Sequence, residues 1–178
     1  MLTEEQYKIL EYCYNELKWN IIPATASKRP AVKNFADYFD RKKTFTLEEI
    51  IAYGEKVERP YYSNVLGKQR DGTYSIVFDV DVKDEAIKRL VLRIFRSCVY
   101  QETPRGYHFF FKVVMDDDDS NNNNDDDIKR ELKELQGTII MPNLVECYTE
   151  SRHVIFLGEG YGRLQLHNNN NTVFLHIQ

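Results

Sequence analysis

Tyr74-Ser75-Ile76-Val77-Phe78-Asp79-Val80-Asp81 is an apolar run that ends in two carboxylates one residue apart. Its apolar and aromatic residues predict a strand, and residues two apart on a strand point to the same side, separated by about 6.5–7 Å. Asp79 and Asp81 can therefore converge on bound cations. Mg²⁺ or Mn²⁺ in such a site usually engages substrate phosphates, so the pair indicates nucleotide chemistry. The competing interpretation is two solvated acids at a strand end.

The length of 178 residues fits one domain that spans residues 1–178. Its three cysteines, Cys13, Cys98 and Cys147, are isolated and belong to no Cys/His cluster that would indicate zinc. This usage predicts a reducing, cytoplasmic setting. No stretch approaches the roughly 20 apolar residues of a membrane span, and the N-terminus is acidic, so neither a membrane partner nor a signal peptide is expected.

The net charge of −4 is concentrated in one segment of the chain. Seven aspartates, Asp116 to Asp119 and Asp125 to Asp127, flank an asparagine run. Without these seven, the chain holds 24 basic and 21 acidic residues, so its net charge does not exclude a nucleic-acid partner. Residues 116–127 are predicted to form a flexible, self-repelling loop.

Local patterns predict helices and strands in mixed order. Capping boxes at Thr3 and Thr46 predict helices that end near Trp19 and Tyr53, and Asp84 is the expected N-cap of a third helix. The apolar stripe of that third helix is Ile87, Leu90, Val91 and Ile94, and a short helix is expected around Ile128 to Leu135. Strands are predicted over residues 20–23, 61–66, 74–80, 98–102, 107–114, 144–148, 152–157 and 172–177. The Asp71-Gly72 turn predicts a hairpin of 61–66 with 74–80. The order of the predicted helices and strands indicates an α+β domain with a largely antiparallel sheet.

A second segment that can carry chemistry runs from Thr103 to Lys112. Its strand places His108, Phe110 and Lys112 on one face, and the other face is aromatic and predicted to be core. His108 could donate to a phosphate, with Arg105 adding positive charge, or it could be a structural histidine.

Glu146 is a third candidate acid, flanked by apolar residues on its own predicted strand. An acid in that place is costly to bury unless it finds a cation, so Glu146 either completes a three-carboxylate site or faces solvent.

In this order, Asp-x-Asp, Thr-x-x-Gly-x-His and a later single acid resemble the prim-pol branch of the archaeo-eukaryotic primase superfamily, found in replication proteins of archaeal plasmids, viruses and phages. The resemblance extends upstream to Ile21-Ile22-Pro23, Ser27-Lys28-Arg29-Pro30 and Asn64-Val65-Leu66-Gly67, and so covers roughly Trp19 to Gly158.

The resemblance implies an archaeo-eukaryotic primase-like fold: a mostly antiparallel sheet of modified RNA-recognition type, with flanking helices and a small N-terminal α/β unit. Asp79, Asp81 and Glu146 would hold two divalent cations, Mg²⁺ or Mn²⁺. The triphosphate of a nucleoside triphosphate would be bound by His108, Arg105, Thr103 and Lys28. The implied activity is that of a DNA primase/polymerase, in which a primer 3′-hydroxyl attacks the α-phosphate on a DNA template.

The chain departs from the family pattern at its third acid, where the family more often has aspartate, and Glu150 is a nearby rival for Glu146. Because no helical or helicase domain follows within the sequence, a helicase or helical accessory domain is an expected partner and nucleotidyl transfer is better supported than de novo priming. Two alternatives stay open: an inactive prim-pol-like module that binds nucleotide or single strands, and a metal-dependent nuclease.

Overall fold

The computed structural model describes residues 2–95, 98–114, 130, 133–134, 139–141, 145–149, 151–162, 164–165 and 174–176. The helices are α1 (Glu4–Asn15), α2 (Leu47–Lys56) and α3 (Glu85–Ile94), with a 3₁₀ helix η1 (Phe35–Arg41). The strands are β1 (Ile21–Ala24), β2 (Tyr61–Val65), β3 (Gly67–Lys68), β4 (Tyr74–Asp81), β5 (Val99–Glu102), β6 (Gly106–Val114), β7 (Ile139–Met141), β8 (Val145–Tyr148), β9 (His153–Leu157) and β10 (Phe174–His176).

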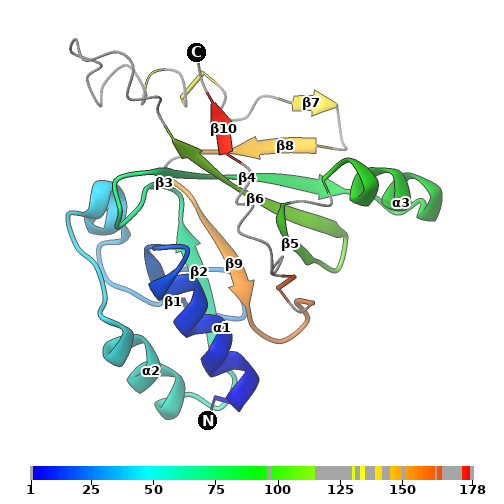
Figure 1. Ribbon diagram of the computed structural model, residues 1–178. Coiled ribbons are helices and arrows are strands. Elements are labelled where there is room, and N and C mark those ends of the chain that lie inside the picture. The colour runs from blue at the N-terminus through cyan, green and yellow to red at the C-terminus, as the bar shows by residue number, and fades with distance from the viewer. Residues whose placement is uncertain are drawn as a thin grey trace.

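These strands form two sheets, and the chain is an α+β protein as predicted. A three-stranded antiparallel sheet has the order β1-β2-β9. A seven-stranded sheet has the order β10-β6-β4-β8-β7, with β3 beside β4 and β5 beside β6. Its pairs are antiparallel except that of β10 with β6. Figure 1 shows the smaller sheet with α1 and α2, and the larger sheet with α3.

Local sequence signals explain where the helices begin. Both predicted capping boxes are present: the Thr3 hydroxyl accepts from the Gln6 amide, and the Thr46 hydroxyl accepts from the Glu49 amide. Asp84 caps α3, as predicted, by accepting from two backbone N–H groups. The first two helices differ from expectation at their ends, since α1 stops before Trp19 and α2 continues past Tyr53.

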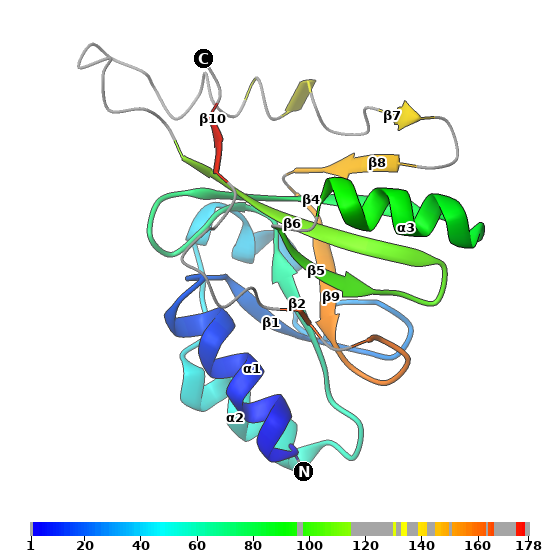
Figure 2. The same cartoon turned by 45° about the vertical axis from the view of Figure 1, so that its right-hand side comes forward.

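The seven-stranded sheet is covered on both faces. One face packs against α1 and the three-stranded sheet, where Trp19 lies between Phe110 of β6 and Phe156 of β9. The opposite, aromatic face of β6 is buried under α3, as predicted, and Phe109 there contacts Phe95 at the end of that helix. The two views in Figures 1 and 2 agree that α3 lies on the side of the large sheet away from α1 and α2.

The predicted apolar stripe of α3 is wrong for three of its four members. Val91 is buried, but Ile87, Leu90 and Ile94 are 40%, 55% and 63% exposed. The helix meets the sheet through Val91 together with Leu92 and Phe95, which are partly buried against the same cluster. The predicted stripe and the residues that face the sheet both recur at helical spacing. Periodicity alone therefore could not tell which of the two sets is buried.

The predicted hairpin of β2 with β4 is also wrong. The chain leaves the small sheet at Val65 and enters the large sheet at Gly67, so the hairpin partner of β4 is the short β3. Gly67 adopts a positive φ of 96° at this crossing. The buried Gln69 amide donates to the Val65 and Gly67 carbonyls and holds the bend in place.

Within the described part of the chain, no helix is long and apolar enough to cross a membrane. The three cysteines are free and buried. The predicted loop 116–127 lies outside the described residues, as does most of the helix expected around Ile128 to Leu135.

We predict that Trp19→Ala lowers the free energy of unfolding by about 3–5 kcal/mol, because it empties the contact between the two sheets. Ile94→Ala is the control, and its cost should stay within about 0.5 kcal/mol because Ile94 is exposed. Urea unfolding followed by circular dichroism measures both, since Trp19 is the single tryptophan and its loss removes the fluorescence probe. Equal losses in the two variants would contradict this packing.

Candidate functional site

The register of β4 brings the predicted site residues into one row. Asp79 lies opposite His108 of β6 on one side and Glu146 of β8 on the other. Gln101 of β5 lies opposite His108, which extends the row across a fourth strand. Because cross-strand neighbours point to the same face, these four side chains share one face, and Asp81 follows on the same face of β4.

Gly106 allows β6 to lie close to β4 beside the carboxylates. Gly106 lies opposite Asp81, and a Cβ built on it would come within 1.8 Å of the Val80 carbonyl oxygen. No side chain fits there without moving the backbone of β4. The Thr103 hydroxyl accepts from the amides of Gly106 at 3.0 Å and Arg105 at 3.4 Å. Thr103 therefore shapes the turn through its hydroxyl oxygen, which accepts from the backbone.

The environment of Asp79 raises its pKa to about 6. Burial is the largest cause, followed by the negative charge of Asp81, and Glu146 adds to it. Arg105 and Lys28 act in the opposite direction. The three carboxylates are thus close enough to repel one another, which is the electrostatic condition that a bound cation would relieve.

His108 is a neutral ring at pH 7, since its pKa is lowered to about 4. Burial is the main cause, and the charges of Lys28 and Arg105 contribute, while the Ile155 backbone partly opposes them. Its Nε2 faces Oδ1 of Asp79 at 3.5 Å, longer than a normal hydrogen bond. Its Nδ1 is buried and has no hydrogen-bond partner among the described residues.

Protein groups already contact the other two carboxylates. Arg105 lies 3.2 Å from Asp81, and the Tyr148 hydroxyl donates to Glu146 at 2.6 Å. As the side chains stand, no three His, Cys, Asp or Glu groups in the described residues are arranged to hold one metal ion. A cation shared by the carboxylates would have to compete with these two contacts.

Lys28 lies close enough to the site for its charge to act on Asp79 and His108. It lies in a turn that joins β1 to the following segment, and its backbone has a positive φ of 62°. The turn is closed by a hydrogen bond from the Lys28 amide to the Thr25 carbonyl and another from the Thr25 amide to the Arg29 carbonyl. Such a conformation is costly for a residue with a side chain, and it is often retained at functional sites.

Tyr161 is a neighbour that the sequence did not reveal. Its ring centre lies 6.3 Å from that of His108, and the Lys28 ammonium lies 5.8 Å from the Tyr161 ring centre. Tyr161 is far from both in sequence, so only the fold brings the three together. Tyr148 was missed as well, although its position two residues after Glu146 on one strand is a signal that the sequence contains.

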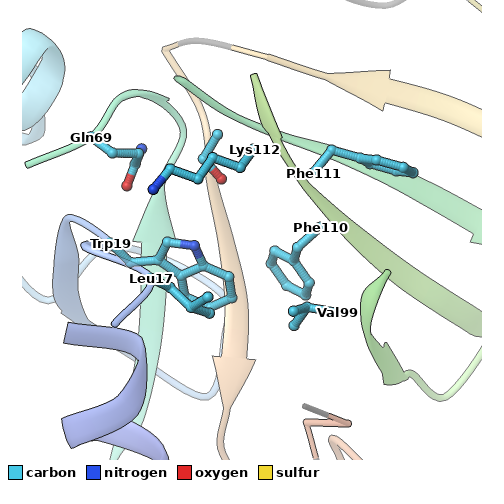
Figure 3. Close-up of a pocket in the computed structure, with 8 residues that line it drawn as sticks. Leu17, Trp19, Gln69, Val99, Phe110, Phe111 and Lys112 are labelled. Carbon is cyan, nitrogen blue, oxygen red and sulfur yellow. The ribbon is translucent and has the colours of Figure 1, made fainter. Parts of the chain in front are cut away.

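A small cavity lies on the same sheet face but at the other end of β6. Figure 3 shows it between Trp19, Phe110 and Lys112, with Gln69 at its rim. Its volume of about 20 Å³ has room for about one water molecule, so it is not a substrate pocket.

The structure therefore brings together Asp79, Asp81, Glu146, His108, Arg105 and Lys28. Glu150, the rival third acid, lies outside the described residues. No protein-family model matches the chain, and no curated protein matches it either.

We predict that Gly106→Ala destabilises the protein by at least about 2 kcal/mol, because the added methyl group overlaps the Val80 carbonyl. Glu102→Ala, at an exposed position on the preceding strand, should cost less than about 0.5 kcal/mol. Thermal unfolding compares the two variants. Wild-type stability in Gly106→Ala would show that β4 and β6 are not held as closely as described.

Proposed function

We propose that this protein is a nucleotidyltransferase of the prim-pol type, a DNA primase/polymerase that adds nucleotides to a primer on a DNA template. The observation that carries the proposal is the row formed by His108, Asp79 and Glu146 on adjacent strands, with Asp81 beside it. Such a reaction needs acids that bind metal ions and a group that donates a hydrogen bond to a phosphate. The three acids and His108 lie on one face of the sheet and can supply both.

The fold agrees with this proposal at a coarse level. The resemblance implies a largely antiparallel sheet that bears the site and a small N-terminal α/β unit in front of it. The seven-stranded sheet carries the acids, and α1, α2 and the three-stranded sheet stand on the side of the acidic row. This arrangement supports prim-pol architecture without being specific to it.

The chemistry of the donor set suits a divalent cation, which the side chains would have to rearrange to bind. Asp79, Asp81 and Glu146 offer hard carboxylate oxygens, which Mg²⁺ and Mn²⁺ prefer. Burial, and then repulsion by the other two carboxylates, raises the pKa of Asp79. When bound, such cations would activate the attacking hydroxyl and stabilise charge on the leaving phosphates. Cation binding and the contacts of Asp81 with Arg105 and of Glu146 with Tyr148 are mutually competitive.

The basic and neutral groups would serve the substrate. Neutral His108 carries one N–H that can donate to a phosphate oxygen. Arg105 and Lys28 supply positive charge toward the same face, because both influence the pKa of Asp79 and that of His108. Released from Asp81, the exposed Arg105 guanidinium is free to bind a phosphate.

Primer extension tests the proposed reaction. With a labelled primer, a template, nucleoside triphosphates and Mn²⁺ or Mg²⁺, we predict extension that is abolished by EDTA. Asp79→Asn should reduce the rate at least about 100-fold, since it removes the central ligand of the site. Asp37→Asn, an exposed acid on η1, should leave the rate unchanged.

Each other result points elsewhere. Extension that survives in both Asp79→Asn and Asp81→Asn would contradict the proposal. A shortened primer would indicate phosphodiester cleavage by the same residues. Nucleotide binding by calorimetry with no product in either metal would indicate a binding module.

A further inference from the structure

Two segments from different parts of the chain meet next to His108 and place the ring of Tyr161 beside the Lys28 ammonium. One is the turn that holds Lys28, and the other is the loop 158–162 that follows β9. The Lys28 ammonium lies 5.8 Å from the centre of the Tyr161 ring, close enough for a cation–π interaction. His108 is another neighbour of the ring, at 6.3 Å between ring centres.

The loop of Tyr161 is fixed by the same row of residues that forms the site. The Gln101 amide, opposite His108 in the register, donates to the Phe156 carbonyl and, at 2.9 Å, to the Gly162 carbonyl. The Gly162 amide donates back to the Glu102 carbonyl at 2.9 Å. Tyr161 is thus held from its C-terminal side against the large sheet.

The Tyr161 side chain also packs against residues of the small sheet. Tyr161 packs against a cluster of Ala24, Tyr61 and Ile155, and Ala24 is the last residue of β1 before the turn of Lys28. Ring and lysine are therefore anchored to the same strand end, and the flexible lysine side chain has a fixed surface to lie on. This matters because a free lysine loses considerable rotamer entropy when it binds an anion.

We infer that Tyr161 is a positioning residue that holds the Lys28 ammonium beside His108 and so forms, with Lys28, a clamp for the oligophosphate of the substrate. The inference rests on the proposed function, since the oligophosphate is the triphosphate of the incoming nucleotide. In this arrangement the carboxylates of Asp79 and Asp81 would bind cations, and the Lys28 ammonium would bind the anionic phosphates.

The ring is the part of Tyr161 that the inference uses. A cation–π contact needs the aromatic face and not the hydroxyl, so phenylalanine should replace tyrosine without loss. Leucine retains apolar packing against the Ala24 cluster but offers no aromatic face. The pair Tyr161→Phe and Tyr161→Leu therefore separates positioning of Lys28 from mere packing.

Titration of the full-length protein with inorganic tripolyphosphate, followed by calorimetry, tests the clamp without requiring catalysis. We expect Lys28→Met to weaken binding about tenfold or more and Tyr161→Leu to weaken it about two- to fivefold, while Tyr161→Phe binds like wild type. Tyr161→Leu should have no further effect in a Lys28→Met background. Tyr14→Leu is the matched control, because it removes a remote ring under Arg70 and should not change binding.

The inference would be overturned if Tyr161→Leu left tripolyphosphate binding unchanged, or if the wild-type protein did not bind it. It would also be overturned if Tyr161→Leu weakened binding as much in the Lys28→Met background as in the wild-type background. In primer extension, Tyr161→Leu should raise the nucleotide KM by the same two- to fivefold with kcat nearly unchanged. Tripolyphosphate binding with the expected variant pattern but no extension would refute the proposed function and leave the clamp intact. Primer extension in which Tyr161→Leu leaves the nucleotide KM unaltered would refute the clamp and leave the proposed function intact.

Discussion

The antiparallel register of β4 between β6 and β8 is the constraint on which the site depends. A shift of one residue would send Asp79 and Asp81 to the aromatic face under α3, because strand side chains alternate between faces. Aromatic and aliphatic residues on both faces of β4 and β6 make such a shift costly. Gly106 further restricts the register, because only a residue without a Cβ lets the two strands approach this closely beside Asp81.

The second sheet buries part of this row of side chains: His108 is largely buried, whereas Glu146 and Arg105 stay exposed. The Asn64 side chain of β2 donates to Ser75 of β4 at 3.0 Å, and the Leu66 amide donates to the Arg152 carbonyl at 2.9 Å, where the chain crosses between the sheets. The buried Asn64–Ser75 hydrogen bond links the small sheet to the large one, and the Leu66–Arg152 bond extends the pairing of β2 with β9. Burial of His108 under this junction lowers its pKa to about 4, so the electrostatics of the site follow from the packing of the two sheets.

Sequence patterns predicted those features that depend on neighbours in the chain. Eight of the ten described strands, the capping boxes and the two faces of β6 were predicted correctly because side-chain alternation and capping are local properties. The short strands β3 and β7 were not predicted. The path after Val65 was not, since it depends on the buried Gln69 amide that holds the bend. Tyr161 was not found because its contact with His108 exists only after both sheets have formed.

Shared binding of cations by Asp79, Asp81 and Glu146 is the property that we propose for this site. A crystal of the protein soaked with a nucleoside triphosphate and Mn²⁺, measured at a wavelength where manganese scatters anomalously, tests it most directly. We predict an anomalous peak at the Asp79 and Asp81 carboxylates, with Arg105 moved away from Asp81 and a phosphate at His108. Manganese bound elsewhere, or none at these carboxylates while the nucleotide is bound, would contradict it.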